Sequence, residues 1–255
     1  MYKNEREQEI MKLLTSENYA TVKQLSQWLY TSESSIRRDL TSLEKQGMVT
    51  RSYGGVELVK DSSNIIPFST RAHHNIAAKK NMARKAVRLI HDGDIVFLDQ
   101  SSSAFFVAYE LLKKAKITVV TNNIEIISLL SGSDVEVLSS GGRLSKSNRV
   151  CLLGDDAHLI FEQIHADIMF FSTKSLSADG VLYDCVREEV CIRNTMLANA
   201  AQKVYLCDSE KFNHFSGYRQ CALQDVNFMI TEMESKNLPE NVTHYQNMYP
   251  NFMIL

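Results

Sequence analysis

The stretch TSESSIRRDL, residues 31–40, predicts the recognition helix of a DNA-binding module. Ser32 is suited to cap this helix, because its hydroxyl can accept a hydrogen bond from a backbone N–H of the first turn. At helical spacing Ile36, Leu40 and Leu43 fall on one face, which would pack on a core. The opposite face carries hydroxyl and guanidinium groups, which can bind phosphates and read base edges. Its members are Ser34, Arg37, Arg38, Thr41 and Lys45. An ordinary solvated charged face is the alternative interpretation.

Two shorter helical patterns precede this stretch. Ile10, Leu13 and Leu14 recur at helical spacing, and Thr21 is placed to cap a second short helix. That second helix would end near Leu29, three residues before the recognition helix begins. Two short helices joined by a tight turn form a helix-turn-helix.

A hairpin is predicted directly after the recognition helix. Gly47 is suited to end that helix in a left-handed conformation. Two extended runs then flank Gly54 and Gly55, a pair that can form the turn of a hairpin. In this position the hairpin would be a wing, with Arg51 and Tyr53 placed near a phosphate or the minor groove. A plain structural ribbon is the alternative.

Composition limits the possible classes of protein. The chain has 255 residues, of which 44% are hydrophobic and 23% charged, so it can bury a sizeable core. Because no apolar run reaches about 20 residues and no signal peptide opens the chain, we expect a cytoplasmic protein that does not span a membrane. The five cysteines form no CxxC pair, so we expect reduced thiols, no metal site and no cofactor. The net charge is only −2, so DNA binding must depend on a local basic face.

A connector is predicted after the hairpin, at residues 59–71. It contains polar loop formers and then Pro67, which disfavours helix entry and favours an extended chain. One long helix is expected from Arg71 to Ile90, with Lys79 and its other basic residues on a solvated face. The sequence thus divides into a winged helix-turn-helix at residues 1–58, a linker at 59–71, and an effector-sensing and oligomerisation domain at 72–255.

Short apolar runs alternate with helical stretches in that last region. This alternation predicts an α/β fold with a mostly parallel sheet and right-handed crossovers. Continuous apolar runs are typical of strands covered on both faces. The runs are residues 95–98, 117–120, 135–138, 168–171, 204–207, 228–231 and 252–255.

Polar residues follow five of these predicted strands. In an open α/β sheet, ligands bind beyond the carboxyl ends of the strands. Hydroxyl and backbone N–H groups at a helix start bind phosphate, and Arg and Lys balance its charge. We therefore expect a site for a small phosphorylated metabolite, although polar residues that merely end strands are the alternative. Its predicted members are Asp99, Ser101, Ser102, Ser103, Thr121, Asn122, Gly142, Arg143, Lys174, Asp208 and Lys211.

The N-terminal motifs resemble the signature of the DeoR family of bacterial transcription regulators. The motifs are Ser32-x-x-Ser35-Ile-Arg-Arg-Asp-Leu40, Leu43-Glu44-x-x-Gly47 and Arg51-x-x-Gly54-Gly55. The resemblance implies that Ser35, Arg37 and Arg38 contact DNA, whereas we expect Asp39 to brace the domain internally. The full set of expected DNA-binding residues is Ser32, Ser34, Ser35, Arg37, Arg38, Thr41, Arg51 and Tyr53.

Motifs in the larger region are similar, in order, to the sensor domain of the same family. They are Asp92-Gly-Asp94, Val120-Thr-Asn122, Gly141-Gly-Arg143, Gly154, Asp167, Gly180 and Asp208-Ser-x-Lys211-Phe212. The resemblance implies a ribose-phosphate-isomerase-like fold that binds a sugar phosphate or a related metabolite and thereby alters the grip on operator DNA.

One segment departs from the family pattern. Family members commonly have Asp-Gly-Gly-Thr-Thr where this chain has Asp99-Gln100-Ser101-Ser102-Ser103. Glycine lets the backbone approach an anion closely and adopt a positive φ, which Gln100 and Ser101 do less readily. Arg193 also replaces a common lysine, which keeps the charge but changes the geometry. The resemblance therefore implies an altered phosphate site.

Together these features predict a regulator, not an enzyme. We expect a repressor of carbohydrate metabolism genes that binds double-stranded operator DNA under the control of a phosphorylated metabolite. A homo-oligomer, dimer or tetramer, is expected because operators usually repeat their half-sites. One alternative is a sugar-phosphate isomerase with an appended DNA module, for which Asp99, Asp208, Glu188 and Glu189 offer carboxylates. The other is a DNA-binding regulator whose altered pocket no longer binds an effector.

Overall fold

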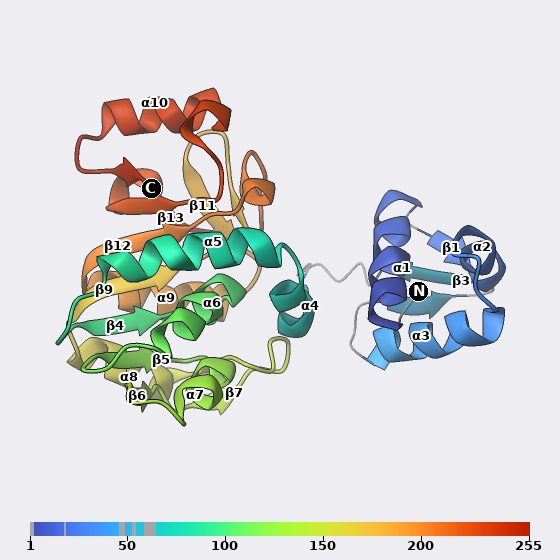
Figure 1. Ribbon diagram of the computed structural model, residues 1–255, viewed down its shortest axis with the longest axis horizontal. Helices are drawn as coiled ribbons and strands as arrows, with labels where there is room; N and C mark the ends of the chain where they lie inside the picture. The colour runs from blue at the N-terminus through green and yellow to red at the C-terminus, as the bar shows by residue number, and fades with distance from the viewer. Residues whose placement is uncertain (1–2, 18, 46–48, 53–54, 59–64) are drawn as a thin grey trace. The chain divides into compact units, whose positions relative to one another are not determined.

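The computed structural model describes residues 3–17, 19–45, 49–52, 55–58 and 65–255 (Figure 1). The chain divides into two compact units, Met1–Pro67 and Phe68–Leu255. Within the described ranges, each helix is too short or too polar to cross a bilayer.

The first unit is a winged helix-turn-helix, as the sequence predicts. Its antiparallel sheet has the strand order β1-β3-β2. Ile36, Leu40 and Leu43 are buried together with Ile10 and Leu14, so the apolar face of the recognition helix packs on the first helix. The elements are α1 (Lys3–Glu17), β1 (Tyr19–Thr21), α2 (Val22–Trp28), α3 (Glu33–Lys45), β2 (Val49–Ser52) and β3 (Gly55–Leu58).

The two expected N-terminal helix caps of this unit are present. Thr21 Oγ1 accepts a hydrogen bond from the backbone N–H of Gln24 at 3.1 Å, and Gln24 Oε1 accepts one from the backbone N–H of Thr21 at 2.8 Å. This reciprocal pair is a capping box. At the start of α3, Ser32 Oγ accepts a hydrogen bond from the backbone N–H of Ser35 at 3.3 Å. The predicted cap Gly47 and the predicted hairpin residues Tyr53 and Gly54 lie outside the described residues.

The second unit contains a seven-stranded sheet with the order β15-β14-β12-β9-β4-β5-β6. Every neighbouring pair is parallel. The predicted α/β fold is therefore confirmed. The strands are β4 (Ile95–Leu98), β5 (Thr118–Thr121), β6 (Glu136–Ser139), β9 (Ala166–Phe171), β12 (Ala200–Leu206), β14 (Phe228–Ile230) and β15 (Met253–Ile254).

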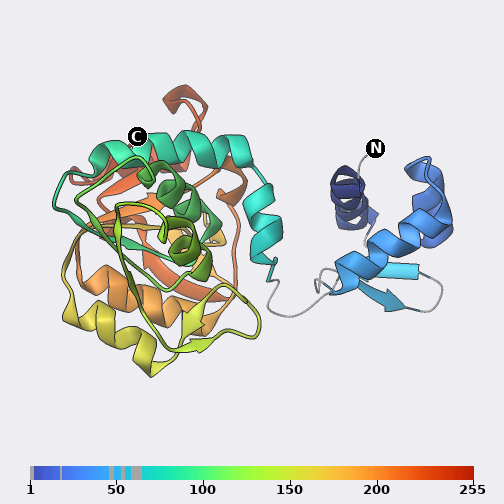
Figure 2. The same cartoon turned by 60° about the horizontal axis from the view of Figure 1, so that its bottom comes forward.

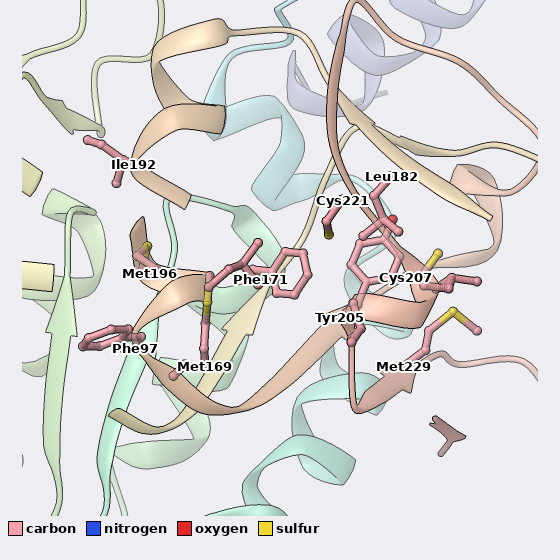
Figure 3. Close-up of a cluster of buried hydrophobic side chains, with 14 of the residues drawn as sticks. Phe97, Met169, Phe171, Leu182, Ile192, Met196, Tyr205, Cys207, Cys221 and Met229 are labelled. Carbon is pink, nitrogen blue, oxygen red and sulfur yellow. The ribbon is translucent and has the colours of Figure 1, made fainter. Parts of the chain in front are cut away.

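Helices cover both faces of this sheet. In Figure 2 the teal α5 lies on one side, and the yellow α8 and orange α9 lie on the other. Val96 and Leu98 pack with α5, α6 and α7, whereas Phe97 packs with α8 and α9. Figure 3 shows Phe97 and its neighbours in the second layer. The helices are α5 (Ile76–Ala86), α6 (Ser102–Leu111), α7 (Ile124–Leu130), α8 (Asp155–Gln163), α9 (Arg187–Ala198) and α10 (Glu240–Met248).

Short elements complete this unit. An antiparallel sheet has the order β10-β11-β13, and β7 pairs with β8. The strands are β7 (Arg143–Leu144), β8 (Leu152–Leu153), β10 (Ser175–Leu176), β11 (Val181–Asp184) and β13 (Tyr218–Ala222). The 3-10 turns are η1 (Val87–Leu89), η2 (Ser209–Lys211), η3 (Leu223–Asp225) and η4 (Ser235–Asn237). The sequence did not predict these elements, because strands of two to five residues carry little periodicity.

The expectation of one continuous helix from Arg71 to Ile90 is wrong. Helix α4 (Phe68–His73) begins directly after Pro67. It ends at His73, and a separate helix, α5, begins at Ile76. At the break Asn75 adopts a left-handed conformation with φ 51°, which asparagine tolerates better than most residues. The Nζ group of Lys79 donates hydrogen bonds to the carbonyls of Arg71 and His74, both at 2.5 Å. These bonds tie α5 to the end of α4, where the Arg71 carbonyl also accepts a hydrogen bond from the backbone N–H of His74 at 3.4 Å.

Candidate functional sites

The predicted DNA-binding face of α3 is exposed. Ser34, Arg37, Arg38 and Thr41 are all exposed, while Ser35 is half-buried. Arg37 Nη2 donates a hydrogen bond to Glu33 Oε2 at 2.8 Å, and Arg38 Nε donates one to the Ser34 carbonyl at 3.4 Å. An exposed pair one helical turn apart contributes little stability, so both guanidinium groups can exchange these partners for DNA.

Arg51 on β2 is bonded to the recognition helix. Its Nη2 donates hydrogen bonds to Thr41 Oγ1 at 2.5 Å and to the Arg37 carbonyl at 3.2 Å. Its Nε lies 3.2 Å from Glu44 Oε2. The side chain stays partly exposed on the same side as Thr41, so Arg51 links the wing to α3. A direct DNA contact from Arg51 stays a prediction.

Asp39 braces the first unit, as we expected. The carboxylate is 2% exposed and accepts two hydrogen bonds from Arg6, from Nε at 2.5 Å and from Nη2 at 3.0 Å. A two-point pair of this kind fixes orientation as well as distance. It ties α1 to α3 from the side opposite the DNA-binding face.

The carboxylate of Asp99 is fully engaged by the protein. Asp99 is 0% exposed, and its Oδ1 accepts a hydrogen bond from the backbone N–H of Ser101 at 3.0 Å. Its Oδ2 accepts one from Ser172 N at 3.3 Å and one from Arg193 Nε at 2.9 Å. Asp99 thus joins the ends of β4 and β9 to α9, which is a positioning role.

The three serines after Asp99 form the start of α6. Ser101 caps the helix, because its Oγ accepts a hydrogen bond from the backbone N–H of Ala104 at 3.1 Å. Ser102 and Ser103 are buried in the first turn. The positive end of a helix dipole and its free N–H groups favour an anion at this position.

The predicted site residues at the ends of β5 and β6 mainly contact other parts of the protein. Thr121 Oγ1 donates a hydrogen bond to the Leu98 carbonyl at 2.7 Å, which links β5 to β4. Asn122 Nδ2 donates one to the Leu152 carbonyl at 3.3 Å. Gly142 has φ 91°, and a Cβ there would lie 2.5 Å from the Leu153 carbonyl oxygen. Arg143 is exposed and forms an ion pair with Glu188.

Basic side chains gather near the ends of β9 and β12. Lys211 Nζ donates a hydrogen bond to the Thr173 carbonyl at 2.7 Å and lies 3.7 Å from Asp208 Oδ2. Burial lowers the pKa of Lys174, and the charges of Lys211 and Arg71 lower it further. We call Arg71, Lys79, Lys174 and Lys211 the cationic cluster, because the charges of Arg71 and Lys211 lower the pKa of both Lys79 and Lys174.

Lys79 belongs to this cluster, contrary to the sequence analysis. The helical spacing places it on a solvated face, but it is only 5% exposed. Burial lowers its pKa to about 8, with further lowering by Lys211 and Arg71 and an opposing effect from Asp208. The turn at Asn75 directs Lys79 toward α4. The sequence prediction assumed one continuous helix through residues 71–90, so it could not include this turn.

A second cluster of buried polar side chains lies around Arg193 and Glu189 on α9, and the sequence did not predict it as a site. Arg193 is 1% exposed, and its Nη1 lies 3.0 Å from Asp184 Oδ2 while its Nε bonds Asp99. Glu189, on the same helix, accepts hydrogen bonds from Gln100 Nε2 at 3.0 Å and from Asn148 Nδ2 at 2.9 Å. Burial raises the pKa of Glu189, and the charge of Asp184 raises it further.

Both units match models of one protein family. Residues 6–62 match the DeoR-like helix-turn-helix domain, and residues 74–233 match the DeoR C terminal sensor domain. The chain also resembles part of a ribose 5-phosphate isomerase A from Methanocaldococcus jannaschii, with 17% identity over 52% of this chain and 53% of that one and a TM-score of 0.40.

Curated relatives match along most of their length. The HTH-type transcriptional regulator GolR of Listeria innocua is 30% identical over 91% of this chain and 91% of its own. The HTH-type transcriptional repressor GlcR of Bacillus subtilis is 30% identical over 91% and 89%. The L-fucose operon activator of Escherichia coli is 30% identical over 89% and 94%. These proteins are named as regulators rather than enzymes, which confirms the expectation of a regulator. With both of its domains matched, the chain belongs to the DeoR family of DNA-binding transcriptional regulators.

Proposed function

We propose that this chain is a repressor of carbohydrate metabolism genes whose operator binding is controlled by a phosphorylated sugar or a related metabolite. Relatives named for sugar operons support the gene class: three are L-fucose operon activators and one is a putative aga operon transcriptional repressor. A repressor named GlcR supports the direction of control. The operator-binding form is a homo-oligomer, since a single helix-turn-helix reads only one half-site.

The cationic cluster is the observation that carries the effector part of this proposal. Burial lowers the pKa of Lys79 and of Lys174, so both ammonium groups lie where their charge is poorly solvated. A phosphate dianion next to them would stabilise their charged forms, in addition to Asp208, Glu210 and Asp184, whose charges already raise these pKa values. The N-terminus of α6, with Ser102 and Ser103, adds backbone N–H groups of the kind that bind phosphate.

Two of the four carboxylates that the isomerase alternative could use are held by hydrogen bonds within the protein. Asp99 accepts three hydrogen bonds from the protein, and Glu189 accepts two. A general base must lie within hydrogen-bond reach of the proton that it abstracts. These two groups support the arrangement of the site instead.

The test is operator binding measured by fluorescence anisotropy on the DNA upstream of the gene, at fixed salt, with and without a panel of sugar phosphates. We expect one compound to weaken operator binding at least tenfold in the native protein. Lys174→Met should abolish that response and leave DNA binding without effector unchanged. Lys80→Met is the matched control, since Lys80 is an exposed base on α5 outside the cationic cluster.

Two results would contradict the proposal. Tight operator binding that no phosphate compound alters would leave a DNA-binding regulator without an effector of this class. A response that persists unchanged in Lys174→Met would place the effector away from the cationic cluster.

A further inference from the structure

The side chain of Gln100 is turned into the protein. It stands just before α6, yet it is only 1% exposed, and its Nε2 donates a hydrogen bond to Glu189 Oε2 at 3.0 Å. Asn148 Nδ2 donates to the other oxygen of Glu189 at 2.9 Å. Two carboxamide groups therefore hold both oxygens of one buried carboxylate.

The oxygens of these carboxamides have no partners. Gln100 Oε1, Asn148 Oδ1 and Asn122 Oδ1 are buried, and no atom of the described residues donates a hydrogen bond to them. Turning the amide groups over would not help, because their nitrogens would then lose Glu189 or the Leu152 carbonyl. Buried acceptors are rarely left in this state in native proteins. Three in one region would accept hydrogen bonds from a ligand that brings donors.

Gln100 lies between two parts of the proposed effector site. On one side is the first turn of α6, where Ser102 and Ser103 mark the expected place of a phosphate. On the other side is Glu189 on α9, which Gln100 contacts directly. A ligand that extends from that phosphate toward Glu189 meets the Gln100 side chain, so the length of this side chain limits the length of the ligand.

We propose that Gln100 is a specificity-determining residue of the effector site. Its side chain takes up the space beside Glu189 and restricts the site to a short phosphorylated polyol, whose hydroxyl groups donate to the unpartnered oxygens of Gln100, Asn122 and Asn148. This inference rests on the proposed function, because the cationic cluster and α6 hold the phosphate.

The test compares three probes by titration calorimetry on the full chain: inorganic phosphate, glycerol 3-phosphate and glucose 6-phosphate. The native protein should bind glycerol 3-phosphate at least tenfold more tightly than glucose 6-phosphate. Gln100→Ala removes the obstruction, so its affinity for glucose 6-phosphate should rise at least tenfold. Gln100→Ser is also shorter than glutamine and keeps a polar group, so it should give the same gain and serves if the alanine variant does not fold.

Gln100→Met is the matched control for size. Methionine keeps the length of glutamine and lacks the amide, so this variant should still exclude glucose 6-phosphate. It should also bind glycerol 3-phosphate more weakly, because one acceptor oxygen is gone.

The possible failures are distinguishable. The role of Gln100 is disproved if the native protein binds glucose 6-phosphate as tightly as Gln100→Ala does. It is also disproved if the affinity of Gln100→Met for glucose 6-phosphate rises as much as that of Gln100→Ala. Neither result would contradict the phosphate site. If no phosphate probe binds the native protein or either enlarged variant, the proposed effector class and the inference about Gln100 both fail.

Discussion

Arg193 Nε and Asp99 Oδ2 lie 2.9 Å apart, and their side chains are 1% and 0% exposed. The pair joins α9 to the end of β4, and Asp184 lies 3.0 Å from the other side of the same guanidinium. Removing one partner of a buried pair leaves an uncompensated charge in a poorly solvated place. The arrangement of the strand ends therefore depends on this contact.

Arg193→Met should lower the free energy of unfolding by about 3 to 5 kcal/mol, because Asp99 and Asp184 then lose their cation. Urea unfolding followed by circular dichroism measures this change. Arg143→Ala is the matched control: its pair with Glu188 is exposed, so the loss should be about 1 kcal/mol or less. Equal losses in the two variants would show that the buried pair has no special structural role.

Much of the fold could be predicted from local pattern. The strand at Ile95–Leu98 is predicted with its observed bounds, because a strand covered on both faces needs only a continuous apolar run. The helix-turn-helix could be predicted because Ser32 and Thr21 cap helices next to them in sequence. The break at Asn75 could not, since the apolar spacing of α5 continues smoothly into the preceding residues and one left-handed residue carries no periodic signal.

The candidate site was predictable only in part. Polar residues directly after an apolar run are visible in the sequence, which brought Asp99 and Asn122 into the prediction. The bond from Gln100 to Glu189 joins residues 89 positions apart, and no local pattern indicates such a pair. The burial of Lys79 likewise depends on the path of α4, so the sequence alone presented it as a surface base.

Arg37→Ala should weaken operator binding about five- to 150-fold, which corresponds to about 1 to 3 kcal/mol for a guanidinium that reads a base. The melting temperature should stay unchanged, since Arg37 is exposed and its ion pair with Glu33 is solvated. Arg37→Lys separates two roles. If Arg37→Lys binds the operator as tightly as the native protein, Arg37 contacts a phosphate. If it binds as weakly as Arg37→Ala, Arg37 reads a base edge with its planar guanidinium group.

Asp39→Ala should also weaken operator binding, but for a different reason. Arg6 loses its two-point partner, so α1 and α3 keep only their apolar contacts and the first unit should lose stability. Limited proteolysis within residues 1–58 detects this loss. Reduced DNA binding of Asp39→Ala with unchanged protease resistance would contradict a bracing role and indicate direct contact with DNA.

Effector binding should depend on pH through Lys79. Its pKa in the free protein is about 8, and a neighbouring phosphate raises it because the charged form gains a partner. The ammonium is therefore mostly charged below about pH 8, and affinity for a phosphate compound should fall as pH rises above that value. Calorimetry at about pH 8.5, just above that pKa, in buffers of different ionisation enthalpy should show proton uptake on binding. Lys79→Met should show none, and equal uptake in this variant would assign the proton to another group.

Two neighbouring glycines provide a matched comparison of backbone strain and steric contact. Gly141 has φ 68°, and no atom of the described residues lies within 4 Å of where a Cβ would stand, so Gly141→Ala should cost only the strain of a left-handed alanine, about 1 kcal/mol. Gly142 has φ 91°, and its Cβ would also lie 2.5 Å from the Leu153 carbonyl oxygen and 2.9 Å from Ala157 Cβ. Gly142→Ala should therefore push β8 and α8 away and lower the melting temperature by several degrees more than Gly141→Ala does. Equal melting temperatures for the two variants would mean that the contact with Leu153 relaxes freely, and Gly142 would then be free to act in ligand binding instead of packing.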